Sequence, residues 1–279
     1  MKSKLITLLL AIAVAGIYAS CAGDNTKSKG SRVMDELNAD DDVISAEDLS
    51  INYKVPSPLE MFLRMQDRNV PFSIELLNKK ENVVRYVTKY QQAVNLGVYA
   101  SDMAYCSILG DSQNSLEYFN LVKDIAVEIG LYKGINKDLA ERVLNNLTET
   151  DTLISVTTDS YHEVINYIEE QGLTDIQCLV VAGAWIESLY LCLEPMKRNA
   201  SLDDDEMELI QDHQVLLENL IELLSQNRQS GNVAKLLEEL ELIQSVYDVT
   251  YQEEGGVITQ KQFVDIVNVV ADVRAKVIM

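Results

Sequence analysis

Two stretches of this chain, residues 97–106 and 183–192, match each other 86 positions apart, and each lies within a long apolar pattern of helical period. Both begin with glycine, carry an aromatic residue two positions later, close on cysteine, and hold a carboxylate beside a serine. Small residues let two backbones approach closely. We therefore expect these stretches to be the packed central helices of a duplicated unit. Chance similarity is the alternative, because the match rests on few positions.

Apolar residues recur at helical spacing from residue 57 onward, and no strand-like run of more than a few residues interrupts them. One long pattern covers residues 83–109 and is closed by a glycine in a C-cap position. We predict one all-α domain over residues 57–279, a helical bundle of about nine to ten helices. Within it, residues 83–170 and 173–277 are expected to form two similar four-helix units packed together.

The N-terminus has the layout of a secretory signal. Two lysines precede an apolar run from Leu5 to Tyr18 that is too short to span a bilayer, and Ala19 and Ser20 then lead to Cys21. A cysteine directly after small residues resembles the lipobox of bacterial lipoproteins, although Tyr18 stands where that pattern usually has leucine. The resemblance implies a signal peptide over residues 1–20 and a lipid anchor on Cys21, which several acyl chains would make firm.

Residues 21–56, behind the candidate anchor, are polar, become acidic at residues 40–42 and show no sustained periodicity. This composition predicts a flexible acidic tether. Ala22 follows Cys21, where an inner-membrane retention signal would have aspartate, and the acidic cluster of a surface-export signal is weak. We therefore expect an outer-membrane protein that faces the periplasm, with the cell surface as the alternative.

The chain is strongly acidic, with a formal net charge of −21 and a pI of about 4.4. This charge argues against binding nucleic acid or anionic lipid through a basic patch. The simplest consequence of such a surface is solubility.

Motifs for metal or nucleophilic chemistry are missing from the sequence. The chain has two histidines, His162 and His213, and neither follows a glutamate at the spacing of a di-metal bundle. His213 lies on an apolar stripe, so we expect a core histidine, and we predict no metal and no cofactor. The matched Cys106 and Cys192 could form a disulfide if their helices face each other. Buried free thiols are the simpler expectation.

Asp102 and Glu187 are the two features of the matched stretches that packing does not require. Each lies in an otherwise apolar helix, where an unpaired charge would be costly. They could lie on an exposed helix edge or bond locally to the neighbouring serines. The sharper hypothesis is that they converge to line a polar pocket between the two halves. Its lining would be Tyr99, Asp102, Trp185, Glu187 and Tyr190, a set that suits a cationic or polyhydroxylated ligand.

Residues 95–102 and 185–190 together resemble a group of uncharacterised all-helical lipoproteins of Bacteroidota, over about residues 55–275. The resemblance implies the location and the helical fold, and it brings no activity or catalytic residues. We expect a binding or scaffold protein of the envelope rather than an enzyme. Its partner would be another envelope protein or a small polar ligand. The alternative is a hydrolase of envelope polymers that uses Asp102 and Glu187 as an acid/base pair.

Overall fold

The computed structural model describes residues 58–131, 150–199, 201–251 and 258–279, and every secondary-structure element among them is helical. Two 3₁₀-helices, η1 (Ile74–Leu76) and η2 (Lys80–Arg85), lie between the first two α-helices. The α-helices are α2 (Pro58–Asp67), α3 (Lys89–Leu109), α4 (Ser112–Glu128), α6 (Thr150–Glu170), α7 (Thr174–Met196), α8 (Asp204–Gln226), α9 (Gly231–Tyr251) and α10 (Gln260–Val277). The prediction of an all-helical bundle is confirmed. The predicted signal peptide, Cys21 and the whole of the predicted tether lie outside the described residues.

The helix ends follow from local sequence. Thr88 caps α3 by accepting a hydrogen bond from the backbone N–H of Gln91, whose side chain bonds back to the cap. The apolar pattern predicts a helix from residue 83. Because of the cap at Thr88, α3 begins only after that residue. Gly110 ends α3 in the left-handed conformation, with a φ of 91°. Thr259 caps α10 with the same reciprocal arrangement.

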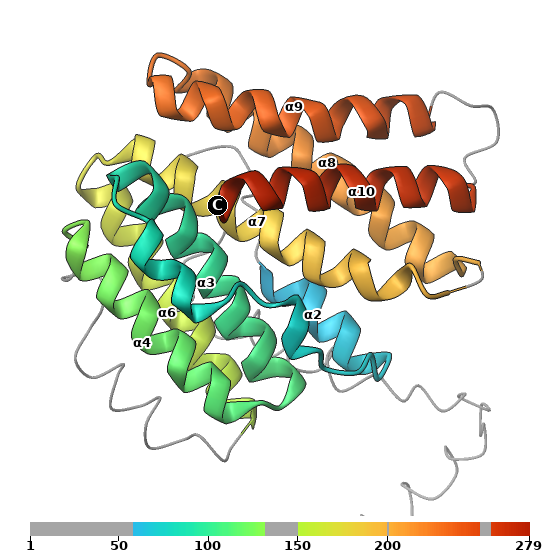
Figure 1. The fold of residues 1–279 in the computed structure, drawn as a ribbon, viewed down its shortest axis with the longest axis horizontal. Coiled ribbons are helices and arrows are strands. Elements are labelled where there is room, and N and C mark those ends of the chain that lie inside the picture. Colours follow the sequence, from blue (N-terminus) through green and yellow to red (C-terminus); the bar gives the residue numbers. More distant parts are fainter. Residues whose placement is uncertain (1–57, 132–149, 200, 252–257) are drawn as a thin grey trace, which may run out of the picture.

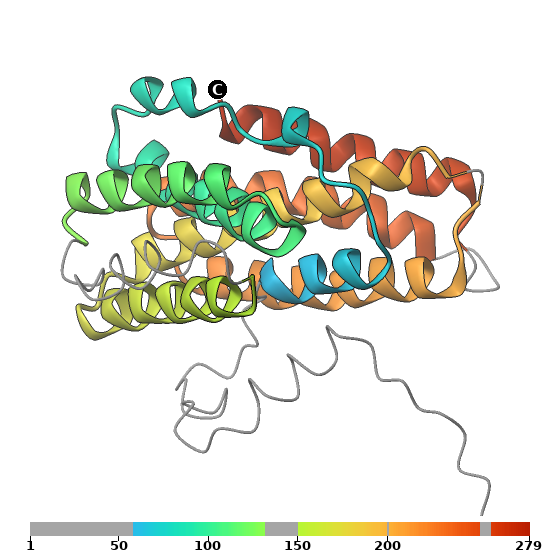
Figure 2. The same cartoon turned by 90° about the horizontal axis from the view of Figure 1, so that it is seen from below.

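Helix α7 occupies the centre of the bundle. It contacts α2, α3, α6, α8, α9 and α10, and Figure 1 shows it between α8, α9 and α10 on one side and α3, α4 and α6 on the other. Figure 2 shows α2 beside α8, and Arg64 of α2 pairs with Asp212 of α8 at 3.5 Å. Among the described residues, α7 is the one helix long and apolar enough to cross a membrane, but 89% of its apolar window is buried in the bundle. These properties fit a core helix.

Helices α3 and α7 cross with their backbones in contact. A Cβ atom on Gly97 would lie 2.0 Å from the carbonyl oxygen of Val180, and one on Gly183 would lie 2.1 Å from that of Val94. Both distances are far inside van der Waals contact, so only glycine fits at either position. The two contacts are related by the same 86-residue offset that relates the matched stretches. Two equivalent helices that pack about a pseudo-twofold axis would make such reciprocal contacts.

The helices around this crossing are less alike. Helix α4 packs along α3, whereas α8 packs mainly on α9 and has little contact with α7. Residues 132–149, where one helix of the first unit is expected, lie outside the described residues. The reciprocal glycine contacts favour duplication of the two central helices, and the division into two similar four-helix units stays a prediction.

Candidate functional site

Polar side chains of α3 and α7 meet in the core about one helical turn beyond the glycines. Ser101, Asp102, Glu187 and Ser188 are all fully buried. The two serine hydroxyls lie 3.1 Å apart, and both lie within hydrogen-bond distance of the carbonyl oxygen of Ala184, at 2.9 and 2.7 Å. The serines are therefore satisfied inside the interface between the two helices, and the two carboxyl groups must find other partners.

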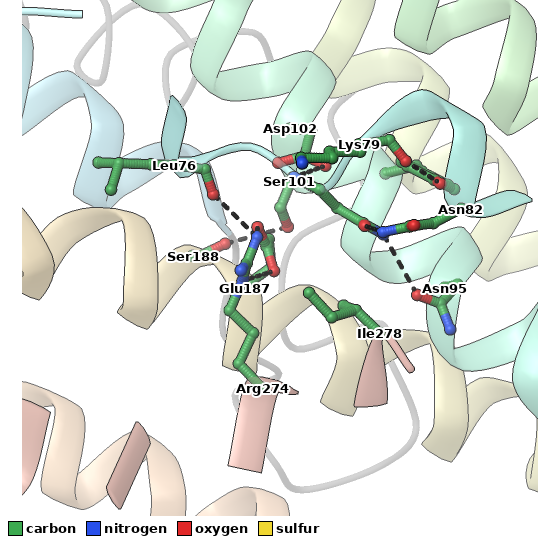
Figure 3. Close-up of polar contacts among 12 residues, drawn as sticks. Leu76, Lys79, Asn82, Asn95, Ser101, Asp102, Glu187, Ser188, Arg274 and Ile278 are labelled. Atoms are coloured by element: carbon green, nitrogen blue, oxygen red, sulfur yellow. Dashed lines mark hydrogen bonds and ion pairs between the residues drawn. The ribbon is translucent and has the colours of Figure 1, made fainter. Parts of the chain in front are cut away.

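Arg274, on α10, is the partner of Glu187. Its Nε and Nη2 atoms donate to the two carboxylate oxygens of Glu187, both at 2.6 Å, as Figure 3 shows. The guanidinium also lies 4.1 Å from the centre of the Tyr190 ring. Burial acts to lower the pKa of Arg274, but the acidic groups around it, Glu187 first and then Asp102 and Tyr190, together raise that pKa above its usual value. Because charge-assisted bidentate pairs are strong, this pair fastens α10 to α7.

Asp102 has a different environment. Its Oδ2 atom accepts a hydrogen bond from the backbone N–H of Asn78 at 3.3 Å, while its buried Oδ1 atom has no donor among the described residues. Burial, and then the charge of Glu187, raise the pKa of Asp102 well above its usual range, although Arg274 acts in the opposite direction. The surroundings therefore favour a neutral carboxyl group at this position.

The segment between α2 and α3, residues 71–88, crosses this cluster, and we call it the strap. Five of its backbone N–H and C=O groups are held by buried side chains of α3, α4 and α10, since its two short 3₁₀-helices do not supply partners for every backbone group. The pairs are Tyr105 with Ser73 N–H (3.1 Å), Arg274 with Leu76 C=O (2.8 Å), Asp102 with Asn78 N–H (3.3 Å), Tyr118 with Asn78 C=O (2.8 Å) and Tyr99 with Lys79 C=O (3.0 Å).

The side chain of Asn78 ties the strap to the C-terminal end of the chain. It donates to the hydroxyl of Tyr86 at 3.0 Å and to Asn95 at 3.5 Å, and it accepts from Asn82 at 2.7 Å. The Tyr86 hydroxyl in turn donates to the carbonyl oxygen of Ile278 at 3.2 Å. The strap, α3 and the residues after α10 are thus joined by one continuous polar network, part of which Figure 3 shows.

The residues expected to line a pocket are brought to one region, but they face protein. Asp102 and Glu187 lie in one cluster, as Figure 3 shows, and the guanidinium of Arg274 lies over the Tyr190 ring. Tyr99 is buried and points to the strap, whereas the indole N–H of buried Trp185 has no hydrogen-bond partner among the described residues. The convergence of the carboxyl groups follows the sharper hypothesis, and a ligand role for these residues stays a prediction.

Sequence reasoning missed the two residues that complete the cluster, Arg274 and Asn78. Arg274 had a visible signal, because it interrupts the inward-facing apolar stripe of its helix between Val273 and Val277. Asn78 had none, because it lies in a short irregular segment whose backbone path depends on what it packs against.

Metal and thiol chemistry find no support in the part of the chain that the structure describes. No group of three or more His, Cys, Asp or Glu side chains there could hold a metal ion. Cys106 and Cys192 are free, buried thiols and do not form the disulfide considered above. Burial raises the pKa of Cys192 to about 12, which makes its thiol unreactive.

His213 is buried, as its apolar stripe predicts. Neither ring nitrogen has a hydrogen-bond partner within the described ranges. Burial lowers the pKa of His213 to about 3, so the ring is neutral at physiological pH.

No protein-family model, no curated protein and no solved structure matches this chain.

Proposed function

We propose that this protein is a lipoprotein of the cell envelope, held by acyl chains on Cys21 in the outer membrane and facing the periplasm. Its helical domain acts by binding, as a scaffold or accessory for another envelope protein or a small polar ligand. The observation that carries the anchor is the apolar run from Leu5 to Tyr18, followed by small residues and Cys21.

The burial of the two carboxyl groups supports binding over hydrolysis. An acid/base pair must contact both the scissile bond and the attacking water. Asp102 and Glu187 are each 0% exposed, and both oxygens of Glu187 already accept hydrogen bonds from Arg274. In this arrangement the pair holds helices and the strap together and leaves no room for a polymer, so we do not adopt the hydrolase alternative.

The exposed residues of α8 and α9 also support a scaffold role. Acidic side chains recur along their outward faces: Asp204, Asp205, Glu208, Asp212, Glu218, Glu222, Glu238 and Glu241. Lys235 is an exposed base on α9, and Arg64 and Arg68 pair with two of these acids, so the faces are predominantly and not uniformly acidic. Predominantly acidic faces favour partners of complementary charge.

Metabolic labelling with a fatty acid tests the anchor. The full-length chain is expected to incorporate label and to fractionate with the outer membrane, whereas Cys21→Ala loses the label. Cys178→Ala is the matched control and retains it, because Cys178 is a buried residue of the helical domain. Label on the Cys21→Ala chain would contradict the proposal. Protease digestion of intact cells distinguishes the periplasmic face from the cell surface.

In-cell photo-crosslinking tests the binding role. A photoreactive residue in place of Val215, which is 56% exposed on α8, is expected to give discrete adducts with an envelope component. The same residue in place of buried Leu217 is the matched control and should give none. The binding role fails if exposed positions yield no adduct while the wild-type chain, but not Glu187→Gln, releases products from purified envelope polymers.

A further inference from the structure

Two carboxyl groups and one guanidinium share the core of this bundle. Asp102 and Glu187 are 0% exposed, and Arg274 is 8% exposed. If both carboxyl groups were ionised, the cluster would carry an uncompensated negative charge in a region from which water is excluded. Burying such a charge is expensive, so proteins remove it by pairing or by neutralisation.

The hydrogen bonds show which carboxyl group lacks compensation. Both oxygens of Glu187 accept from Arg274, at 2.6 Å each. Asp102 receives one N–H, from Asn78 on Oδ2, and its Oδ1 atom has no donor in the part of the chain that the structure describes. The negative charge of Glu187 acts on Asp102 in the direction of its neutral form. Oδ1, the oxygen that no donor reaches, is where a neutral carboxyl group would carry its proton.

The other titratable groups near Asp102 do not supply a compensating charge. Besides Glu187 of α7 and Arg274 of α10, the groups that interact electrostatically with Asp102 are a tyrosine of the strap, a tyrosine and a cysteine of α3, and a tyrosine of α4. These are Tyr86, Tyr99, Cys106 and Tyr118. Burial raises the pKa of each, so all four are neutral at physiological pH.

We propose that Asp102 is a proton-binding site: at neutral pH its carboxyl group is un-ionised, with its proton on Oδ1, and the closed strap keeps water away from it. When the strap closes, the Asp102 carboxylate takes one proton from water and Oδ2 accepts the Asn78 N–H. When the strap opens, water reaches the carboxyl group, which returns that proton to solvent. Opening of the strap is therefore linked to the release of one proton and is favoured as pH rises.

This inference does not depend on the lipid anchor or on a binding partner. It gives the buried polar cluster a role in regulating how tightly residues 71–88 cover α3, α4 and α10. The Asn78 N–H by itself lowers the pKa of Asp102, so the strap favours the acid form through the exclusion of water and not through that hydrogen bond.

Infrared spectroscopy of the full chain at neutral pH tests the proposal directly. The wild-type protein is expected to show the carbonyl stretch of a buried un-ionised carboxylic acid, and Asp102→Asn should lose that band. Glu187→Gln should lose it too, since Asp102 then ionises beside Arg274. Asp265→Asn is the matched control, because that carboxyl group is half exposed on α10 and leaves the band unchanged. A wild-type spectrum without the band overturns the proposal.

The pH dependence of unfolding gives a second measurement. The folded state holds one proton more than the unfolded state, in which Asp102 has its ordinary pKa of 3.8. Relative to Asp102→Asn, the folding constant of the wild type should therefore fall about tenfold per pH unit while Asp102 stays protonated in the folded state. Parallel curves for the two proteins contradict the linkage. If Asp102→Asn does not fold, isotopic labelling of aspartate in the wild type still decides, because it shifts the acid band.

Discussion

Asp102 and Glu187 occupy nearly equivalent places on two crossing helices, yet the fold treats them differently. Glu187 receives two donors from a cation, Arg274, at 2.6 Å. Asp102 receives a single backbone N–H from the strap at 3.3 Å. The first can remain charged because its charge is matched, and the second is driven toward its neutral form by burial and by the charge of the first.

This difference shows that two carboxyl groups in one core can have separate tasks. Glu187 joins α7 to α10 through a bidentate ion pair, whereas Asp102 joins α3 to the strap by accepting a hydrogen bond from the backbone N–H of Asn78. The tasks are set by what the neighbouring element offers, a guanidinium in one case and a peptide N–H in the other.

Removing the cation should produce the largest effect. Arg274→Ala leaves Glu187 buried without its partner, and we expect a loss of about 3–5 kcal/mol in the free energy of unfolding. Urea denaturation followed by circular dichroism measures it. Lys276→Ala is the control, since Lys276 pairs with Glu239 at the surface and its loss should cost less than about 1 kcal/mol. Equal losses in the two variants would show that the buried Arg274–Glu187 pair is no more important for stability than the surface Lys276–Glu239 pair.

The crossing of α3 and α7 at Gly97 and Gly183 positions the two carboxyl groups relative to each other. Substitutions at these glycines are therefore a second way to change the environments of Asp102 and Glu187. Gly97→Ala and Gly183→Ala each place a Cβ against a carbonyl oxygen, at 2.0 and 2.1 Å. We expect each to lose about 1–3 kcal/mol or more, because neither backbone can move without the other. Similar losses support the pseudo-twofold relation. Gly231→Ala is the control, because nothing lies within 4 Å of a Cβ there.

His213 offers a contrast with Asp102, because the two residues make the free energy of unfolding depend on pH in opposite directions. Burial lowers the pKa of His213 from 6.5 to about 3, so the unfolded state binds more protons and stability falls with falling pH. Between pH 7 and pH 5 this loss should reach about 2 kcal/mol. It should be visible in Asp102→Asn and absent from Asp102→Asn/His213→Leu, as measured by denaturation at each pH. If the loss of stability persists in the double variant, another titratable group causes it.

The contacts on the outer face of the strap should contribute least to the free energy of unfolding. Lys80 pairs with Glu117, hydrogen-bonds to Asn114 at 2.6 Å and lies 5.2 Å from the centre of the Tyr118 ring. Because the ion pair is partly exposed to solvent, Lys80→Ala should cost less than about 1 kcal/mol in thermal or urea unfolding. A larger loss would show that the strap is held from outside as firmly as from within.

Part of this arrangement could be predicted from the sequence. The apolar periodicity and the caps at Gly110 and Thr259 predict helices, and the matched stretches locate the helix crossing and both carboxyl groups. The partners could not be predicted in the same way. Arg274 lies 87 positions from Glu187, and Asn78 lies 24 positions from Asp102 in an irregular segment. Contacts at such separations depend on how whole elements dock.

The sequence by itself determined which segments are helical and where two of them must touch, because hydrogen bonds within a helix, caps and glycine spacing act over a few residues. Only the tertiary structure decided that Glu187 meets a guanidinium and Asp102 meets the strap and, through it, the C-terminal end of the chain. The physical reason is burial. A carboxyl group acquires its charge state from the donors that packing brings to it, and those donors come from elements remote in the chain.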